Sequence, residues 1–377
     1  MPARCRSFAM LLTLLAACSG VSPRPDSLDP AALPDRPLEP AERQRVQTLV
    51  DQAMRELVLR HYDLAERTAT AVLGTEPRNA RCHAVLGMVM LQRAKEKEPS
   101  DLFLANGGEA RTVLAERLAP ADPFVGWVRA LFLAESGHLT AAAAAAEAAL
   151  ERAREAPAAE RAPLYGLAGT YRYELGEERA ALPLLEAYAD LRPDDASAQF
   201  RIGVCHLRMS SLPIGPPEKQ DEQAVRDADQ AARAFARCVE LAPGDDDAAL
   251  AIGAATLRAA ELEGKRGRTE ERSQRLQRAI DVFTRAAEKF PHSAEAMFRV
   301  GVAEELRGAE AAAAKAYEAA LARDAQHLGA LLNLAAATAG AGDRTAAIGL
   351  WRRALAVDAE RGGMSPAERK RLQSALQ

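Results

Sequence analysis

The sequence predicts an all-α protein, and three observations favour that fold class. Of the 377 residues 48% are apolar, yet only 5% are aromatic, and alanine is the main apolar residue. Alanine carries little conformational cost in a helix, whereas strands favour β-branched and aromatic residues. The chain also shows no sustained alternation of apolar and polar residues and no Asn-Gly turn between two alternating segments.

The amino terminus has the layout of an export signal. Arg4 and Arg6 give a positive start, residues 8–17 form an apolar run, and small residues precede Cys18. A membrane-spanning helix needs about 20 apolar residues, so this run is too short to span a bilayer. Residues 1–17 are therefore predicted to be a signal peptide.

The sequence Leu15-Ala16-Ala17-Cys18 resembles the bacterial lipobox. The resemblance implies that Cys18 carries a diacylglycerol and an amide-linked acyl chain, and two or more chains hold a protein durably on a bilayer. Ser19 does not resemble the inner-membrane retention signal, which implies an outer-membrane lipoprotein facing the periplasm. Two alternatives stay open, namely an ordinary cleaved signal with an incidental cysteine and a misassigned start.

Residues 18–41 are predicted to form a Pro-rich, flexible linker. This segment contains almost no large apolar residue, and such segments extend at about 3 Å per residue. We therefore expect a stalk between the lipid and the folded body, although a terminus without a spacing role predicts the same conformation. The prolines are Pro23, Pro25, Pro30, Pro34, Pro37 and Pro40.

The rest of the chain repeats a pattern of small and bulky residues. In four places a small residue stands twelve positions before a proline, and in three of them a bulky residue lies between the two, four positions after the small residue. The small residues and prolines are Ala65 with Pro77, Ala181 with Pro193, Ala231 with Pro243 and Ala279 with Pro291; the bulky residues are Leu185, Phe235 and Phe283, whereas Ala69 breaks the pattern. Another small residue often occurs twelve positions upstream, as in Gly169 before Ala181 and Gly301 before Ala313.

This pattern resembles the tetratricopeptide repeat over nearly all of residues 46–361. Two consecutive repeats carry the resemblance most fully: Met297, Val300-Gly301, Ala313, Tyr317 and Ala320, then Leu331, Leu334-Ala335, Ala347, Trp351 and Ala354. In these two, Ala325 and Ala359 replace the final proline of the pattern. The resemblance implies a right-handed superhelical solenoid of antiparallel helix pairs.

The spacing has a physical reason in such a solenoid. Two helices cross closely only where neither projects a large side chain, which accounts for the glycine and alanine positions. The bulky residue of the second helix is expected to fill the wedge between neighbouring repeats, and proline ends that helix because the residue before it avoids the helical conformation. The alternative is a generic Ala-rich bundle, but a recurring coordinated set is typical of solenoid repeats.

We expect about eight repeats within residues 42–361. Their predicted starts lie near residues 46, 80, 123, 162, 196, 246, 294 and 328. Residues 362–377 should form a carboxy-terminal capping helix, because Ser365-Pro366-Ala367-Glu368 has the pattern of a capping box with proline at the first helical position. Such a helix would cover the apolar end of the stack.

Three repeats are longer than the others between their two small residues. The regular separation of 12 residues becomes 23 from Gly87 to Ala110, 28 from Gly203 to Ala231 and 26 from Gly253 to Ala279. The insertions therefore fall between the two helices of a repeat, and the enlarged turns of the fifth and sixth repeats should lie side by side. The basic insertion at residues 261–275 is either a solvated, lengthened helical hairpin or a docking edge for an acidic partner or lipid headgroups.

In the tetratricopeptide family the first helix of each repeat lines the inner surface and contacts ligands. Alignment carries these contact positions over to Met54, Leu57, Met88, Leu91, Trp127, Leu131, Tyr173, Phe200, Val204, Leu207, Arg208, Leu250, Leu257, Phe298, Val302 and Glu305. Apolar surface of that extent usually marks an interaction site, although each residue has packing between repeats as its alternative. The Lys and Asn of the family's carboxylate clamp are absent, so the expected partner is an apolar peptide or amphipathic helix.

The sequence gives no support for catalysis, a metal, a cofactor or nucleic acid. Six histidines are scattered without HExxH, and no P-loop, GxGxxG or GxSxG motif is present. The five cysteines show no CxxC spacing, and a net charge of −4 disfavours nucleic acid as a partner. Cys205 and Cys238 are either free core thiols or a disulfide, which an exported protein permits.

Together these features predict a periplasmic lipoprotein, anchored in the outer membrane, that acts as a protein–protein interaction scaffold or assembly factor. It is not expected to be an enzyme. The alternative is an accessory or regulatory subunit of an envelope enzyme complex, for example in polysaccharide synthesis or secretion.

Overall fold

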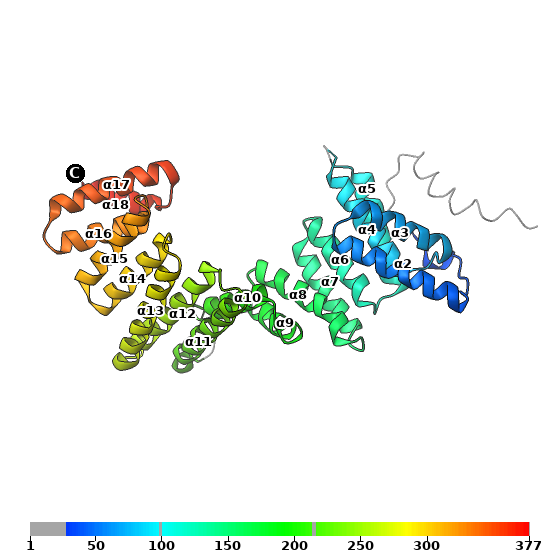
Figure 1. Ribbon diagram of the computed structural model, residues 1–377, viewed down its shortest axis with the longest axis horizontal. Coiled ribbons are helices and arrows are strands. Elements are labelled where there is room, and N and C mark those ends of the chain that lie inside the picture. Colours follow the sequence, from blue (N-terminus) through cyan, green and yellow to red (C-terminus); the bar gives the residue numbers. More distant parts are fainter. Residues whose placement is uncertain (1–27, 98–99, 213–215, 377) are drawn as a thin grey trace, which may run out of the picture. The chain divides into compact units, whose positions relative to one another are not determined.

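The structure is a computed structural model that describes residues 28–97, 100–212 and 216–376. Within these residues the regular elements are all helices, so the predicted all-α class is confirmed (Figure 1). None of the described helices is both long enough and apolar enough to cross a bilayer. The predicted signal peptide, Cys18 and the first part of the linker lie outside the described residues.

The helices form two compact modules, and the amino-terminal module ends at Pro193. Its four pairs are α2 (Pro40–Val58) with α3 (Tyr62–Thr75), α4 (Ala80–Lys95) with α5 (Leu102–Leu118), α6 (Pro123–Glu135) with α7 (Leu139–Arg152), and α8 (Ala158–Glu174) with α9 (Glu178–Leu191). The first helix of each pair also contacts the first helix of the next, from α2 through α4 and α6 to α8. These four helices therefore form one continuous layer.

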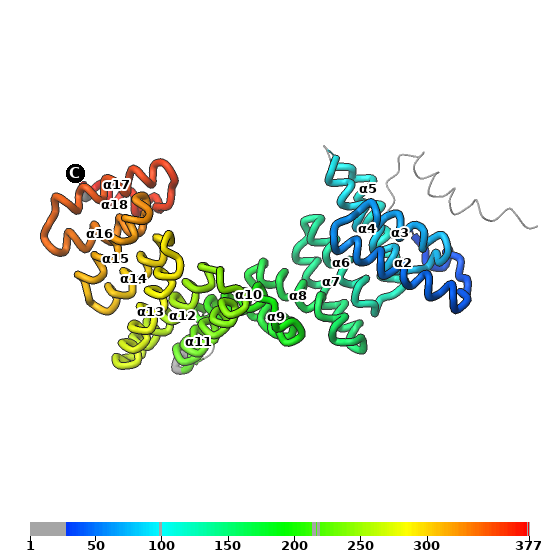
Figure 2. Tube along the Cα trace, in the orientation of Figure 1, coloured from blue at the N-terminus to red at the C-terminus, as the bar shows by residue number. Residues whose placement is uncertain are grey.

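The carboxy-terminal module begins at Asp194. Its pairs are α10 (Ala196–Met209) with α11 (Pro217–Leu241), α12 (Asp246–Lys265) with α13 (Thr269–Lys289), α14 (Ala294–Arg307) with α15 (Glu310–Arg323), and α16 (Leu328–Gly340) with α17 (Arg344–Arg361), followed by α18 (Pro366–Ala375). Each second helix also contacts the first helix of the next pair. The predicted solenoid of antiparallel pairs is confirmed, and Figure 2 traces these pairs along the chain.

The observed helix starts can be compared with the expected repeat starts. Residues 80, 123, 196, 246, 294 and 328 are the first residues of α4, α6, α10, α12, α14 and α16. The expected starts at 46 and 162 lie inside α2 and α8, which begin at Pro40 and Ala158. Both helices begin with a turn that lacks large apolar residues, Pro40 to Arg43 in α2 and Ala158 to Arg161 in α8, so the apolar periodicity begins only after it.

A glycine in the first helix of a pair makes room for a large side chain of the second helix. A Cβ on Gly301 would lie 2.4 Å from Cε1 of Tyr317, and one on Gly253 would lie 2.4 Å from Cε1 of Phe283. Gly203 meets Phe235 in the same way at 2.6 Å. The ring therefore lies over the glycine of its own pair, whereas the sequence had placed it in the wedge between pairs.

The insertions of the fifth and sixth repeats mainly lengthen helices, although seven residues still separate α10 from α11 in the fifth repeat. Helices α11, α12 and α13 have 25, 20 and 21 residues, compared with 14 in α14 and α15, and only residues 266–268 separate α12 from α13. The added segments pack together, with Ala224 and Val225 of α11 against Leu262 of α12. Arg275 of α13 donates to both carboxylate oxygens of Asp229 on α11, at 2.5 and 3.0 Å. The lengthened helical hairpin is therefore confirmed.

The second half of the predicted linker lies against the amino-terminal module. Residues Pro30–Ala32 form a short 3-10 helix, Leu38 packs on the core, and Asp35 accepts a hydrogen bond from Arg78 at 3.2 Å. Arg117 of α5 donates to the Leu28 carbonyl at 3.5 Å. A free stalk is therefore wrong for residues 28–39, because a single apolar side chain and two arginines are enough to fix this segment.

Helix α18 ends the carboxy-terminal module. Ser365 and Glu368 form the expected capping box at its start. The buried carboxylate of Asp358 on α17 accepts hydrogen bonds from the Met364 amide at 2.8 Å and from Arg369 at 2.5 Å, which joins α18 to α17. These contacts hold the pKa of Asp358 below its usual value.

Candidate functional site

The predicted contact residues of the amino-terminal module divide into two groups. Met54, Trp127, Leu131 and Tyr173 are partly exposed, but Leu57, Met88 and Leu91 are only 4%, 3% and 4% exposed. Helix α4 lies between α2 and α6, so both of its flanks are covered. Leu57, Met88 and Leu91 therefore pack in the core, which is the alternative that the sequence left open for each of them.

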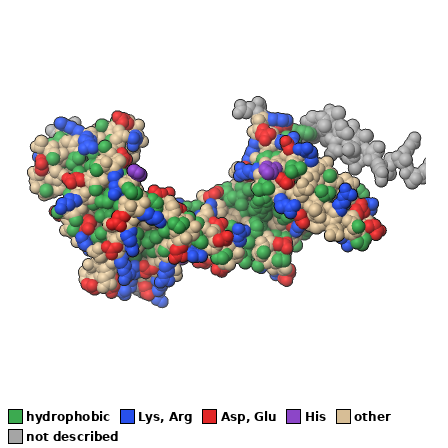
Figure 3. Space-filling view, in the orientation of Figure 1, with side chains coloured by type: hydrophobic (Ala, Val, Ile, Leu, Met, Phe, Trp, Pro, Cys, Tyr) green, Lys and Arg blue, Asp and Glu red, His purple; other side chains and the backbone are tan. Residues whose placement is uncertain are grey.

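In the carboxy-terminal module most predicted contact residues keep some exposure. Leu257 is the exception, because it is 7% exposed and packs in the core with Leu276 and Ile280. The partly exposed apolar side chains are Phe200, Val204, Leu207, Leu250, Phe298 and Val302, and Arg208 and Glu305 are exposed. Figure 3 shows hydrophobic side chains gathered in the region of α6–α8 of the amino-terminal module. We call the partly exposed predicted residues of each module its first-helix face.

Phe298 has the most closely defined surroundings on the first-helix face of the carboxy-terminal module. Its ring centroid lies 4.9 Å from that of His327 and 5.9 Å from that of Tyr317. His327 Nδ1 accepts from the Ala330 amide at 3.1 Å, so Nε2 carries the proton and donates to Glu295 at 3.0 Å. This hydrogen bond lowers the pKa of Glu295, and the two contacts of His327 fix the ring beside which Phe298 stands.

Glu305 of the predicted set is tied to a buried tyrosine. The Tyr317 hydroxyl donates to Glu305 Oε2 at 2.5 Å and accepts from the Asn333 side-chain amide at 3.1 Å. Burial raises the pKa of Tyr317, so its hydroxyl stays protonated and keeps donating. The exposed carboxylate of Glu305 is thus held in place at the first-helix face by the core beneath it.

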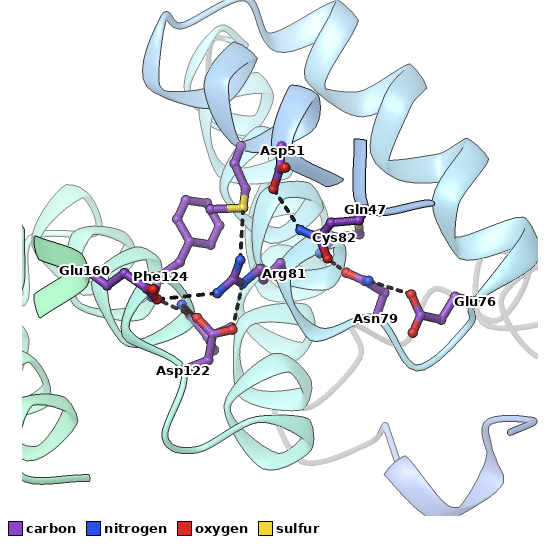
Figure 4. Close-up of polar contacts among 11 residues, drawn as sticks. Gln47, Asp51, Glu76, Asn79, Arg81, Cys82, Asp122, Phe124 and Glu160 are labelled. Carbon is purple, nitrogen blue, oxygen red and sulfur yellow. Dashed lines mark hydrogen bonds and ion pairs between the residues drawn. The ribbon is translucent and has the colours of Figure 1, made fainter. Parts of the chain in front are cut away.

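Arg81 joins residues from several first helices of the amino-terminal module (Figure 4). Its Nε donates to Asp122 Oδ2 at 2.7 Å, its Nη1 lies 3.9 Å from the Met54 sulfur, and its Nη2 lies 4.0 Å from Glu160. Arg81 therefore links α4 to α2, to the start of α6 and to α8. Phe124, which follows Asp122, lies beside this cluster with its ring 5.8 Å from that of Trp127.

The sequence reasoning missed both Arg81 and Phe124. Arg81 is the second residue of α4, which begins at Ala80, and Phe124 is the second residue of α6, which begins at Pro123. The second position is one of the contact positions of the tetratricopeptide family. The alignment concentrated on later positions in these helices and on apolar residues. Reading the second position of every repeat would have found both side chains.

A pocket of about 420 Å³ lies where the long α12–α13 hairpin passes the end of α14. It is lined by Glu261, Gly264, Lys265, Thr269, Arg272, Leu276 and Leu306. The stem of Arg272 crosses Gly264, and its guanidinium donates to the Leu306 carbonyl at 2.7 Å. Arg272 therefore supports the negative end of α14, which gives part of the basic insertion a structural role.

The described thiols and acidic clusters also have structural explanations. Burial raises the pKa of Cys82 to about 12 and also raises that of Cys238, so neither thiol is activated. Cys238 is a free thiol, and the alternative of a disulfide with Cys205 is therefore wrong in this structure. Asp245, Asp246 and Asp247 gather at the start of α12, where Asp245 caps the helix by accepting from the Ala248 amide at 2.9 Å.

Comparison with known proteins supports the repeat assignment. The tetratricopeptide repeat family model matches residues 167–212 and 265–327. These two segments carry tetratricopeptide repeats. No curated protein matches the sequence.

Similar solved structures include three other proteins. The MamA protein is 17% identical, with a TM-score of 0.39, and the match covers 54% of this chain and 98% of that one. YrrB, described as a TPR protein with an unusual peptide-binding site, is 20% identical with a TM-score of 0.43, covering 58% and 95%. A thermophilic TPR protein of Thermus thermophilus is 21% identical with a TM-score of 0.40, covering 55% and 95%.

Proposed function

We propose that the protein is an interaction scaffold that binds a partner protein through its first-helix faces. The observation that carries this proposal is the set of large apolar and aromatic side chains left partly exposed on consecutive first helices. Phe200 packs edge-on against Phe235, and Phe298 rests on Gly329, where a Cβ would be 2.9 Å from its ring. Side chains that are exposed on one side and fixed on the other lose little entropy on binding.

The chemistry of these faces favours a peptide or helix as the partner. Their apolar side chains recur on successive helices, which suits an extended apolar segment or an amphipathic helix. The titratable side chains near these faces are held by hydrogen bonds within the protein, as in the Glu295–His327 and Glu305–Tyr317 contacts. They serve to position neighbouring rings. Partner binding is therefore a better match to the described residues than group transfer.

We also propose that this scaffold is an outer-membrane lipoprotein of the cell envelope that faces the periplasm. It rests on Leu15-Ala16-Ala17-Cys18 and on Ser19 at the following position. Because residues 28–39 lie against the amino-terminal module, residues 19–27 would be the tether. Nine residues reach at most about 30 Å, so the folded chain would remain close to the lipid surface.

The anchor can be tested by acyl-chain labelling in bacterial cells. The wild-type chain is expected to incorporate labelled fatty acid and to fractionate with the outer membrane. The Cys18→Ser variant should lose the label and leave the membrane fraction, because no other residue would carry the lipid. Label retained by this variant would rule out Cys18 as the acylated residue, and a Cys82→Ser variant provides the control because Cys82 is buried.

The binding surface can be tested by photo-crosslinking in cells. A photoreactive phenylalanine at position 200 or 298 should give discrete crosslinked products, because both positions lie on the first-helix face. The same residue at exposed positions on second helices, Glu151 and Arg285, is the matched control and should give none. Equal products from both sets, or products from the control set alone, would contradict the proposed surface.

A further inference from the structure

We propose that the partner segment bound by the amino-terminal module presents a basic side chain, lysine or arginine, to the Arg81 cluster. This cluster consists of Asp51, Met54, Arg81, Asp122, Phe124 and Glu160 (Figure 4). The inference rests on the proposed function, and it adds the charge of the residue that the partner places here.

The positive charge of Arg81 is already neutralised inside the protein. One carboxylate oxygen of Asp122 accepts a hydrogen bond from Arg81 Nε. The other oxygen accepts hydrogen bonds from the backbone amides of Phe124 and Val125, at 2.9 and 3.3 Å. Asp122 is 17% exposed and Arg81 28%, so this pair is largely shielded from water. The charge of Arg81 therefore adds little attraction for an acidic group of a partner, because Asp122 already compensates it.

Two further carboxylates, those of Glu160 and Asp51, lie around this pair and are available to a partner. Glu160 touches the cluster only at its edge, 4.0 Å from Arg81 Nη2, and its side chain is 52% exposed. Asp51 stands one helical turn before Met54 on α2 and accepts a hydrogen bond from the neighbouring Gln47 at 2.8 Å. Once Arg81 and Asp122 cancel, these two carboxylates leave the cluster with a net negative charge.

The apolar members of the cluster favour the same partner. Phe124 offers an aromatic face next to the carboxylate of Glu160 (Figure 4), and such a face attracts a cation. The Met54 thioether and the Phe124 ring provide a surface for the methylene groups of a long basic side chain. An acidic partner residue would instead meet the like charge of Asp51 and Glu160, so the cluster discriminates against it.

The inference can be tested by selecting random peptides on the full-length protein. Peptides recovered on the wild type should be enriched in lysine or arginine beside apolar residues. A recovered peptide should bind about fivefold more weakly to Glu160→Gln, as expected for one partly exposed ion pair, and more weakly at high salt. Glu151→Gln, the same change on the exposed face of α7, is the control and should leave the affinity unchanged.

The outcomes separate this inference from the proposed function. Replacing the basic residue of the peptide with norleucine should weaken binding to the wild type but cause little further loss with Glu160→Gln, because both changes remove one interaction. Peptides that lack basic residues, or that bind wild type and Glu160→Gln equally, would overturn the inference and leave the scaffold function standing. A selection that recovers no binding peptide would count against both.

Discussion

Replacing Gly253 with alanine should destabilise the carboxy-terminal module by about 1–3 kcal/mol, although alanine is the better helix former. The new Cβ would lie 2.4 Å from Cε1 and 2.6 Å from Cζ of Phe283. The Phe283 side chain is fully buried, so its ring has no space into which it can withdraw. The steric cost therefore exceeds the gain in helix propensity, which is about 1 kcal/mol.

The effect of Gly253→Ala on stability should change sign when the Phe283 ring is removed. Phe283→Ala alone is expected to cost about 3–5 kcal/mol, because it leaves a cavity over Gly253. In that background Gly253→Ala no longer meets the ring and should stabilise the module by up to about 1 kcal/mol. Such a reversal would show that the glycine is required by its contact with Phe283 and not by its backbone conformation.

Urea denaturation can measure this cycle in the carboxy-terminal module alone. The chain has two tryptophans, Trp127 in α6 and Trp351 in α17, so a Trp127→Phe background reports on the second module through Trp351. Gly349→Ala is the matched control, because a Cβ at Gly349 would meet nothing within 4 Å and should therefore stabilise α17. If Gly253→Ala stabilises the module as Gly349→Ala does, the close contact is not the reason for glycine at 253.

The spacing of small and bulky residues predicted the helix pairs well because that spacing is local. Gly301 and Tyr317, for example, meet within one pair whose turn is only a few residues long. The insertions misled the prediction, since a gap between Gly253 and Ala279 does not say whether the added residues form a turn or extend two helices. Leu276, which packs on the core, shows that the extension is helical and apolar on one side.

The candidate site was less predictable because its exposure depends on how successive pairs are rotated. The repeat positions of Met88 and Leu91 assign them to the inner surface, but α4 lies so close to α2 and α6 that both side chains are buried. Arg81 was missed because a charged residue near the start of a helix is expected to point into solvent, whereas this one lies in a largely shielded ion pair. Its partner Asp122 is 41 residues away, and sequence spacing gives no sign of that pairing.

Acidification from pH 6.5 to pH 4 should destabilise the amino-terminal module through one buried histidine. His83 of α4 is 5% exposed, its Nε2 donates to the Pro77 carbonyl at 2.8 Å, and its Nδ1 accepts from Arg111 at 3.3 Å. Burial, together with the Arg111 guanidinium, lowers the pKa of His83 from 6.5 to about 4, although the hydrogen bond to the Pro77 carbonyl raises it. A second proton on this ring would sit on Nδ1, facing a buried cation.

The sign of the pH effect follows from which state binds the proton. Above pH 6.5 His83 is neutral in both the folded and the unfolded chain, so it contributes no pH dependence. Between pH 6.5 and pH 4 the unfolded chain takes up a proton that the folded module excludes, and the free energy of unfolding falls by about 3 kcal/mol over this window. Below pH 4 both states are protonated, and this contribution to the slope ends.

Urea denaturation at several pH values, followed by Trp127 fluorescence in a Trp351→Phe background, measures this loss in the amino-terminal module. His83→Gln keeps one donor and one acceptor but does not titrate, so its unfolding free energy should fall much less than that of the wild type. Carboxylates with lowered pKa values, such as Glu135, contribute equally to both proteins and cancel in the difference. The same change at exposed His138 is the control and should leave the slope as in the wild type. If the plots of unfolding free energy against pH are parallel for wild type and His83→Gln, another group causes the acid sensitivity. The exclusion of the proton from His83 would then have no energetic consequence.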